Sequence, residues 1–186
     1  MSIRPAKYED LTYIKNMCDK YIGENYYTEE YLDRAFRDDA HFFAVYAGDN
    51  DVPAAFIYMF VTSFSDAADN LKIPCGIPEL AGIPGNQRVG VFKTTCTEEE
   101  YRRQGILLKL MNYCESIFRS IGIDSIFLDA LKLPSGKIPA GSGLEQMHFK
   151  KLTEISHPWS EIDAYCPYCK RSRCMCNAVL CYKEIE

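Results

Sequence analysis

The sequence lacks any long hydrophobic run. None of its apolar stretches approaches the roughly 20 residues that a helix needs to cross a bilayer, so we expect no membrane partner. The residues after Met1, Ser-Ile-Arg-Pro-Ala-Lys, also lack the apolar core of a secretory signal peptide. Together these absences predict a cytoplasmic protein.

A basic excess is also missing. The 186 residues contain 21 Lys and Arg against 26 Asp and Glu, a net charge of −5. Proteins that bind nucleic acids through phosphate contacts carry clustered basic charge, so we expect no nucleic-acid partner. Apolar residues make up 47% of the chain, which is enough for a full core. The length fits one domain over residues 1–186.

The most informative segment is a predicted strand, turn and helix. Residues 88–95 are rich in β-branched and aromatic side chains, and apolar residues recur at helical spacing after Gly105. The first N–H groups of a helix have no partner inside it and lie at the positive end of its dipole, which suits a phosphate. Gly105 lets the backbone approach closely, and Arg102 and Arg103 add positive charge. The segment therefore predicts a pyrophosphate site made mostly of backbone.

The hexapeptide at residues 102–107 resembles the R/Q-x-x-G-x-G/A acetyl-CoA motif of the GCN5-related N-acetyltransferase (GNAT) superfamily. Arg102 and Gly105 match it, whereas Leu107 stands where the family usually has Gly or Ala. The alternative is a basic surface turn before an ordinary helix. The resemblance implies acetyl-CoA as cosubstrate, with contacts from Arg102, Arg103, Gln104, Gly105, Ile106 and Leu107. It also implies that the pantetheine arm pairs with strand backbone at Thr94, Thr95 and Cys96.

The order of predicted elements also resembles the superfamily. Strands are predicted at 3–6, 41–47, 53–62, 88–95, 124–130 and 178–185, and helices at 11–22, 28–37, 106–121 and 144–152. Asp10 and Thr28 are predicted helix caps, and residues 48–51 a turn. The resemblance implies an α/β (α+β) fold with a mixed, mostly antiparallel sheet, helices on both faces, and a splay between the fourth and fifth strands.

Residues 63–87 interrupt this pattern. Pro74, Pro78 and Pro84 together with several glycines predict a loop insertion. It either folds near the acceptor site or is a surface excursion without a role in chemistry. The tyrosines before the second predicted helix leave a similar choice, between lining the acceptor pocket and ordinary packing; they are Tyr26, Tyr27 and Tyr31.

Direct acetyl transfer needs a neutral amine, a polarised thioester carbonyl and a proton for the leaving thiolate. The resemblance implies that the backbone near Thr95 and Cys96 stabilises the oxyanion. The family's usual proton-donating Tyr is replaced by Phe149, which has no proton to give. The fourth strand lacks the Glu that many relatives use as a base. The remaining candidates for acid and base are Glu79, His148 and Asp129, and a water chain is the alternative.

Five of the nine cysteines crowd residues 166–181. An odd count without an export signal argues against a disulfide framework. The spacing C-x₂-C-x₄-C-x-C supplies four thiolates, which is a ligand set for structural zinc; the residues are Cys166, Cys169, Cys174 and Cys176. The alternative is reduced thiols on a hairpin between the last two strands.

These observations favour an acetyl-CoA-dependent N-acyltransferase that transfers acetyl directly to an amine of a small molecule or peptide. A second interpretation is a catalytically weak CoA-binding or sensing protein of the same fold. A third is an interaction module built on the zinc hairpin. The sequence leaves a monomer and a homodimer both open.

Overall fold

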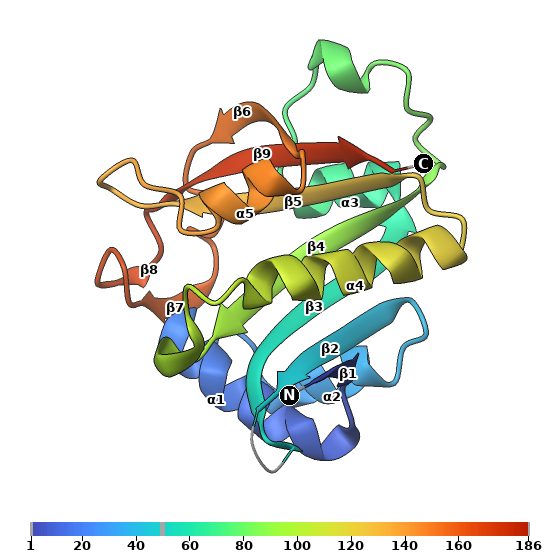
Figure 1. Cartoon of the computed structure of the whole chain (residues 1–186). Coiled ribbons are helices and arrows are strands. Elements are labelled where there is room, and N and C mark those ends of the chain that lie inside the picture. The colour runs from blue at the N-terminus through green and yellow to red at the C-terminus, as the bar shows by residue number, and fades with distance from the viewer. Residues whose placement is uncertain (1, 49–50, 186) are drawn as a thin grey trace.

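The computed structural model describes residues 2–48 and 51–185, so residues 49–50 of the predicted turn lie outside the described part (Figure 1). A seven-stranded sheet runs in the order β1-β2-β3-β4-β5-β9-β6. All neighbouring strands are antiparallel except β4 and β5, which confirms the expected mixed, mostly antiparallel sheet. The strands are β1 (Ser2–Pro5), β2 (His41–Ala47), β3 (Pro53–Ser63), β4 (Arg88–Thr97), β5 (Ser125–Lys132), β6 (Lys150–Ile155) and β9 (Asn177–Glu184).

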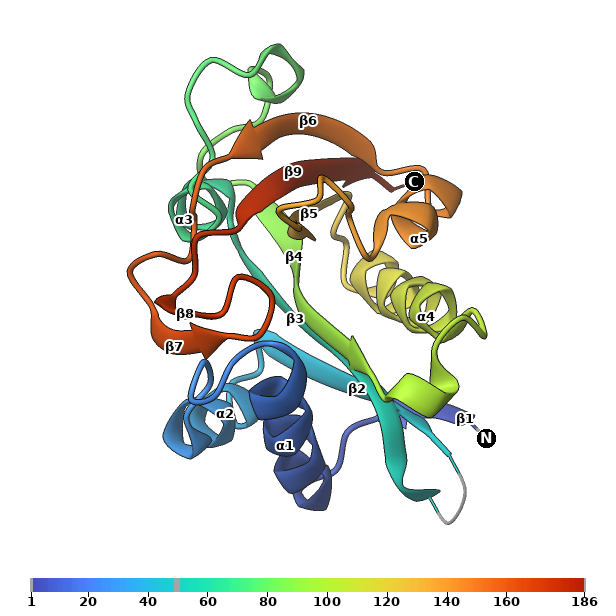
Figure 2. The same ribbon diagram turned by 90° about the vertical axis from the view of Figure 1, so that its left-hand side faces the viewer.

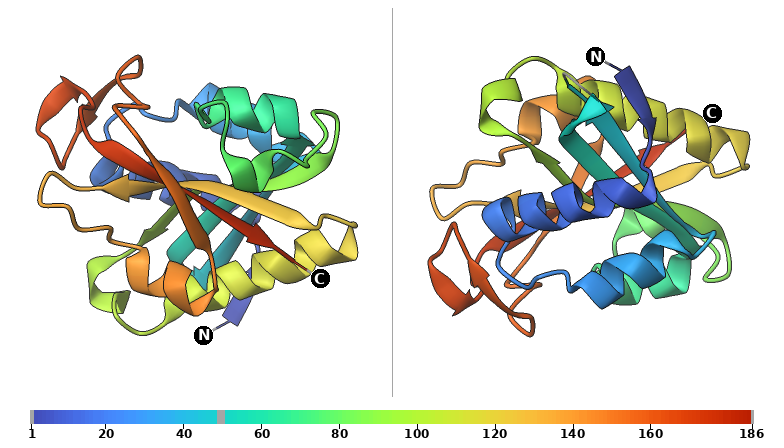
Figure 3. Two further views of the ribbon diagram at one scale, coloured as in Figure 1. Left: turned by 90° about the horizontal axis from the view of Figure 1, so that it is seen from above. Right: turned by 90° about the horizontal axis from the view of Figure 1, so that it is seen from below.

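Helices cover both faces of this sheet, with α1, α2 and α3 on one side and α4 and α5 on the other (Figure 2). Seen from below, α1 and α2 lie across the strands (Figure 3). The helices are α1 (Leu11–Tyr21), α2 (Glu29–Phe36), α3 (Phe64–Asn70), α4 (Ile106–Ser120) and α5 (Gly141–Gln146). Within residues 2–48 and 51–185, no helix combines the length and apolar surface that crossing a bilayer would need.

The interior strand β3 is buried on both faces. Phe56 and Tyr58 pack into the core under α1 and α2, while Ile57 and Met59 pack into the core under α4. This double burial explains why the sequence of β3 is almost continuously apolar rather than alternating.

The two parallel strands part soon after they meet. β4 and β5 pair only at Gly90 with Ile126 and at Val91 with Phe127. On its other edge β4 carries one extra residue, Lys93, because Met59 pairs with Phe92 and Tyr58 with Thr94. Such a bulge bends and twists a strand. The bulge follows the last β4–β5 pair, and the expected splay begins there.

At Gly90, where β4 still pairs with β5, strand β4 approaches α4 closely. A Cβ at this position would lie 2.6 Å from the Phe118 ring on α4. The absence of a side chain therefore lets α4 pack tightly where the two parallel strands still pair.

Two local predictions need correction. Asp10 does not cap α1, because its carboxylate accepts hydrogen bonds from the Lys7 N–H at 2.7 Å and from the Arg4 guanidinium at 2.6 Å. The helix predicted over 144–152 spans only Gly141–Gln146, since His148 adopts φ of 60° and the chain then enters β6. The Thr28 cap is confirmed, because its hydroxyl accepts from the Tyr31 N–H.

The insertion is only partly a loop. Its first residues form α3, which Ser63 caps by accepting a hydrogen bond from the Asp66 N–H. Apolar residues after the helix pack back on the core, with Leu71 and Leu80 buried.

The cysteine-rich segment forms a separate two-stranded sheet between β6 and β9. Its strands are β7 (Asp163–Cys166) and β8 (Arg171–Arg173). A bridge between Glu24 and Tyr165 joins this hairpin to the connection after α1. Figure 1 shows the hairpin beside the end of α1, although the two are about 140 residues apart in sequence.

Candidate active site in the splay between β4 and β5

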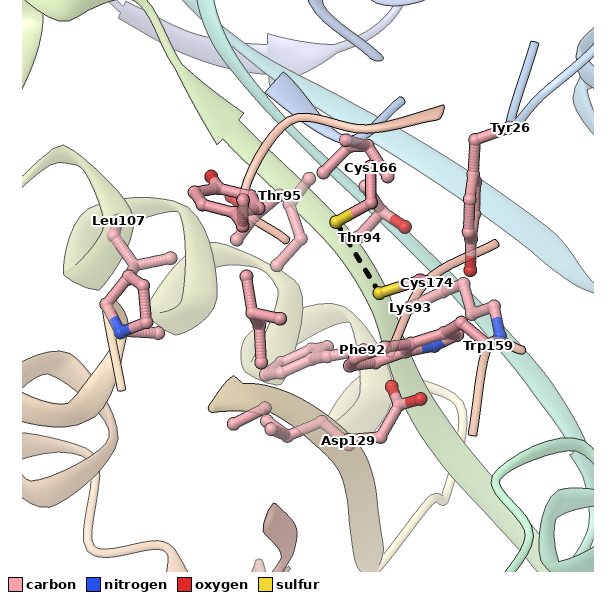
Figure 4. Close-up of a pocket in the computed structure, with 18 of the residues that line it drawn as sticks. Tyr26, Phe92, Lys93, Thr94, Thr95, Leu107, Asp129, Trp159, Cys166 and Cys174 are labelled. Atoms are coloured by element: carbon pink, nitrogen blue, oxygen red, sulfur yellow. Dashed lines mark hydrogen bonds between the residues drawn. The ribbon is translucent and has the colours of Figure 1, made fainter. Parts of the chain in front are cut away.

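A cavity of about 220 Å³ lies where β4 and β5 diverge (Figure 4). One wall is β4 and another is β5. The start of α4 and the C-terminal hairpin region close the remaining sides. The lining includes Tyr26, Phe92, Lys93, Thr94, Thr95, Leu107, Asp129, Trp159, Cys166, Tyr168 and Cys174. Most of the lining is apolar, with a few polar groups set among it.

The start of α4 presents free backbone donors. Arg103 and Gly105 adopt left-handed conformations, with φ of 62° and 71°, and α4 begins at Ile106. In the part of the chain that the structure describes, the N–H groups of six successive residues, 103–108, make no hydrogen bond. This is the arrangement that binds anions at helix N-termini. The structure therefore contains the backbone geometry that the sequence predicted.

The Arg102 side chain holds this turn in place. Its Nε donates to the Thr97 carbonyl at 3.0 Å, and its guanidinium carbon lies 4.5 Å from the centre of the Tyr21 ring. The Glu99 carboxylate lies 4.0 Å away. Arg102 thus links the turn to the end of β4 and to α1. Gln104 adds a bond from its amide to the Glu100 carbonyl at 2.9 Å.

Leu107, the departure from the motif, is accommodated by a glycine. Its side chain lines the cavity and lies against α5 at Gly143, where an added Cβ would be 3.2 Å from the leucine Cδ2. The larger side chain therefore occupies space that a non-glycine residue in α5 would need.

The edge of β4 that faces the splay is open. Beyond Val91, β4 has no strand partner on the β5 side among the residues described. The Thr94 hydroxyl shares a hydrogen bond with the Tyr27 hydroxyl, and the Thr95 hydroxyl donates to the Phe56 carbonyl at 2.9 Å. Cys96 is buried away from the cavity, and burial raises the pKa of its thiol to about 12. A thiol with so high a pKa is a poor nucleophile at neutral pH.

Asp129 and Lys93 bring titratable groups to the cavity. Burial raises the pKa of Asp129, and the Lys93 charge, a backbone hydrogen bond and the nearby Trp159 indole lower it in part. Figure 4 shows the Asp129 carboxylate next to the Trp159 ring. The Lys93 ammonium donates to the Asn70 side chain on α3 at 2.9 Å. Through this contact the insertion reaches the edge of the site.

A second hollow of about 400 Å³ adjoins the first and shares Tyr26, Lys93 and Ile162 with it. The tyrosines named from the sequence all line it, together with charged residues of α2. Burial raises the pKa of Tyr26, so its hydroxyl stays protonated near neutral pH.

Two of the three predicted catalytic residues lie elsewhere. Glu79 is exposed on the 3₁₀ turn Pro78–Leu80 of the insertion, and His148 is exposed after α5. Neither lines the two hollows. Phe149 is buried, with its ring centre 6.1 Å from that of Phe92.

Sequence reasoning missed Trp159 and Tyr168 as lining residues. No local pattern marks them, and the fold alone brings the hairpin region to the splay. A single tryptophan beside a cysteine-rich segment was the one available signal.

The four cysteines of the predicted metal site converge beside the cavity. Their sulfur atoms all lie within 4.8 Å of one another. Cys166 and Cys174 line the cavity, with their sulfurs 3.5 Å apart (Figure 4). Burial raises the pKa of the Cys176 thiol to about 11 and also raises that of Cys174. At Cys169, hydrogen bonds from the Met175 N–H and other groups outweigh burial and lower the pKa.

Solved structures with the same fold include N-acetyltransferases. NAA60 from Arabidopsis thaliana, in complex with acetyl-CoA, has a TM-score of 0.74 at 14% identity, covering 99% of this chain and 98% of that one. Naa20 from Chaetomium thermophilum, in complex with a bisubstrate analogue, has a TM-score of 0.72 at 15% identity, and the match covers 100% of this chain and 87% of that one. The ribosomal-protein-S18-alanine N-acetyltransferase from Escherichia coli has a TM-score of 0.66 at 12% identity, and the match covers 100% of this chain and 94% of that one. At these identities the likeness establishes the fold.

A search of curated proteins found no match. The model of the acetyltransferase (GNAT) family matches residues 8–133. This match spans more than half of the chain, and it includes both strands of the splay and the turn with the free N–H groups. The chain therefore belongs to the acetyltransferase (GNAT) family.

Proposed function

We propose that this chain transfers an acetyl group directly from acetyl-CoA to an amine of a small molecule or peptide, and that residues 1–186 form one acetyltransferase domain. One observation carries the proposal: six successive free N–H groups at the start of α4 stand beside an open strand edge. An anion site and an extended-chain site next to each other suit a pyrophosphate joined to a pantetheine arm.

In this proposal the turn holds the pyrophosphate through backbone N–H groups of residues 103–107. Arg102 and Gln104 hold the turn in place through side-chain hydrogen bonds to the carbonyls of Thr97 and Glu100. The pantetheine arm lies along β4 at residues 94–96 and adds a strand to its open edge. Bound acetyl-CoA supplies the thioester that the amine attacks.

Catalysis in this proposal rests mainly on holding the two reactants together, with modest acid–base help. Asp129 is the one predicted carboxylate that lines the cavity, so we assign it the role of base. A raised pKa beside a specific charge partner is typical of functional carboxylates. Tyr26 and Tyr168 offer hydroxyl protons on the cavity wall, which Phe149 cannot do.

The acceptor amine is proposed to enter through the second hollow. Tyr26 and Lys93 border both hollows, so this route leads to the open edge of β4. Glu30 brings negative charge to this hollow, and Arg34 and Lys93 bring positive charge, so its lining is of mixed charge. The name of the E. coli neighbour describes an acceptor alanine in a protein, which supports including peptide amines among the candidates.

The proposal is tested by calorimetric titration of acetyl-CoA and CoA, followed by thiol release with a panel of small amines and peptides. We expect micromolar acetyl-CoA binding and turnover with at least one amine. Failure of the wild type to bind acetyl-CoA would overturn the proposal.

A second candidate is a CoA-binding or sensing protein with weak catalysis. The observation that favours it is Phe149, which stands where the family usually has a proton-donating Tyr. Acetyl-CoA binding without turnover on any amine of the panel would select this second candidate.

A further inference from the structure

The cysteine cluster has a donor set suited to a metal ion. Four thiolate sulfurs around Zn²⁺ at about 2.3 Å stand about 3.8 Å from one another. The four sulfur atoms here already lie within 4.8 Å of one another. Shifts of less than about 1 Å per sulfur would therefore complete a tetrahedron.

The backbone around the sulfurs is shaped for negative charge. The N–H groups of Met175 and Cys176 each point at a sulfur, of Cys169 and Cys174 respectively, at 3.4 Å. Hydrogen bonds of this kind orient metal ligands and stabilise their charge. The first pair of cysteines is closed by a tight turn, in which the Lys170 N–H donates to the Cys166 carbonyl at 2.8 Å.

The charge of the hairpin also fits. Four thiolates and one Zn²⁺ leave a net charge of −2, and three exposed cations lie on the same turn and strand: Lys170, Arg171 and Arg173. Soft sulfur donors in a tetrahedral set favour zinc over harder cations. Since all four ligands come from the protein, such a site is structural.

The hairpin has few backbone pairs of its own. Its two strands have four and three residues and pair at two positions with a shift in register between them. Isolated two-stranded hairpins are marginally stable in water. A metal that joins Cys166 and Cys169 to Cys174 and Cys176 would fix the two arms relative to each other.

This hairpin is also part of the cavity wall. Cys166, Tyr168 and Cys174 line the cavity. Figure 4 shows Cys174 near Tyr26 and Asp129. On the other side the hairpin approaches the connection after α1 so closely that a Cβ at Gly23 would lie 2.6 Å from the Tyr165 carbonyl. The position of the hairpin therefore sets the shape of the acceptor side.

We propose that Cys166, Cys169, Cys174 and Cys176 bind one structural Zn²⁺ as four thiolates, and that this ion fixes the hairpin as the acceptor-side wall of the cavity. The second half of this statement rests on the proposed function, whereas the metal site itself does not. Metal binding displaces the thiol protons and involves no oxidation.

The first test is the metal content of the purified full-length chain, before and after exchange of the ion for Co²⁺. We expect one zinc per chain and the absorption of a tetrahedral Co²⁺–thiolate site. Cys169→Ser should lose the tightly bound zinc, and Cys75→Ser, which changes an exposed cysteine of the insertion, should retain it. Zinc near zero with freely reactive thiols would overturn the site. A disulfide between Cys166 and Cys174 found by mass spectrometry would overturn it too.

The second test asks whether the bound metal ion fixes the hairpin as a wall of the cavity. After a chelator removes the ion from the wild type, we expect the acceptor KM to rise at least about fivefold while acetyl-CoA affinity stays within twofold. Re-addition of Zn²⁺ should restore the KM, which excludes irreversible unfolding as the cause. An equal loss of acetyl-CoA binding, or an unchanged KM, would overturn the assignment of the wall. If the chain binds no acetyl-CoA but carries one zinc, the proposed function fails and the metal site stands.

Discussion

The two ends of the cavity are built in different ways. At the α4 end, one continuous segment supplies backbone N–H groups, and side chains mainly brace the turn. At the other end, where the acceptor is proposed to bind and which is called the acceptor end below, side chains come from β5, the β4 bulge, the connection after α1 and the C-terminal hairpin. A site made of backbone tolerates changes in side chains, as Leu107 illustrates. A site made of side chains depends on every segment that positions them.

The largest expected effect is at the acceptor end. Asp129→Asn should lower kcat about 100-fold without abolishing turnover, since a positioned base contributes about 10²–10⁴-fold. Acetyl-CoA affinity should stay unchanged, because Asp129 lies away from the α4 turn. Steady-state kinetics and calorimetry measure the two quantities. Glu79→Gln is the control, with no change beyond twofold. A loss above 10³-fold in that variant would place the chemistry at the insertion.

The same residue predicts a pH dependence. The pKa of Asp129 is raised from 3.8 by burial, so kcat/KM should fall as pH drops through a value above 3.8. The free energy of unfolding should change with pH in the opposite direction to kcat/KM. A raised folded pKa means that the contribution of Asp129 is present below the unfolded pKa and lost as pH rises through the folded pKa. Relative to Asp129→Asn, the wild type should therefore lose stability as the pH rises above 3.8, as thermal unfolding across a pH series would show.

The next effect is at the backbone end. Gly105→Val places a β-branched residue at φ of 71°, where strain costs about 2 kcal/mol. A turn that relaxes from this conformation must regain it on binding, so acetyl-CoA should bind up to about 30-fold more weakly. Calorimetry measures the change. Gly122→Val has the same kind of strain, at φ of 74°, at the other end of α4. It should lower stability and leave binding intact. Equal losses of affinity in both variants would mean that general destabilisation is being measured.

Truncating a side chain at the α4 end should lower acetyl-CoA affinity less than Gly105→Val does. Arg102→Ala removes the contacts to the Thr97 carbonyl and the Tyr21 ring, and acetyl-CoA affinity should fall about 5- to 10-fold. Glu99→Ala is the matched control, since an exposed ion pair at 4.0 Å contributes little. A 100-fold loss in Arg102→Ala would show that this end depends on side chains as strongly as the acceptor end does.

The smallest effect concerns the fit between Leu107 and Gly143. In a helix Ala is favoured over Gly by about 1 kcal/mol, but here the new Cβ would crowd Leu107 at 3.2 Å. Gly143→Ala should therefore stabilise the Leu107→Ala variant about 0.5 kcal/mol more than it stabilises the wild type. Denaturant unfolding of the four proteins gives this coupling. Additive effects would show that the leucine does not need the glycine.

The site could be predicted from the sequence only at its α4 end. Strand, turn and helix from Arg88 to Ser120 follow local patterns, and the free N–H groups follow from helix geometry. At the acceptor end, Asp129 was named among three candidates, and the structure brings only that one to the cavity. Trp159 and Tyr168 had no local signature, because their position depends on contacts between distant segments.

The sequence by itself determined the order of β1 to β5 with α1, α2 and α4, the apolar character of β3 and the spacing of the four cysteines, whereas α3 and β6 were not predicted. These features depend on local periodicity and on short spacings, which act within one element or one turn. Tertiary structure alone decided that β9 lies between β5 and β6, that Asn70 contacts Lys93, and that the cysteine hairpin forms a wall of the cavity. The physical reason is that such contacts join segments far apart in the chain, and only the packing of the whole core fixes them.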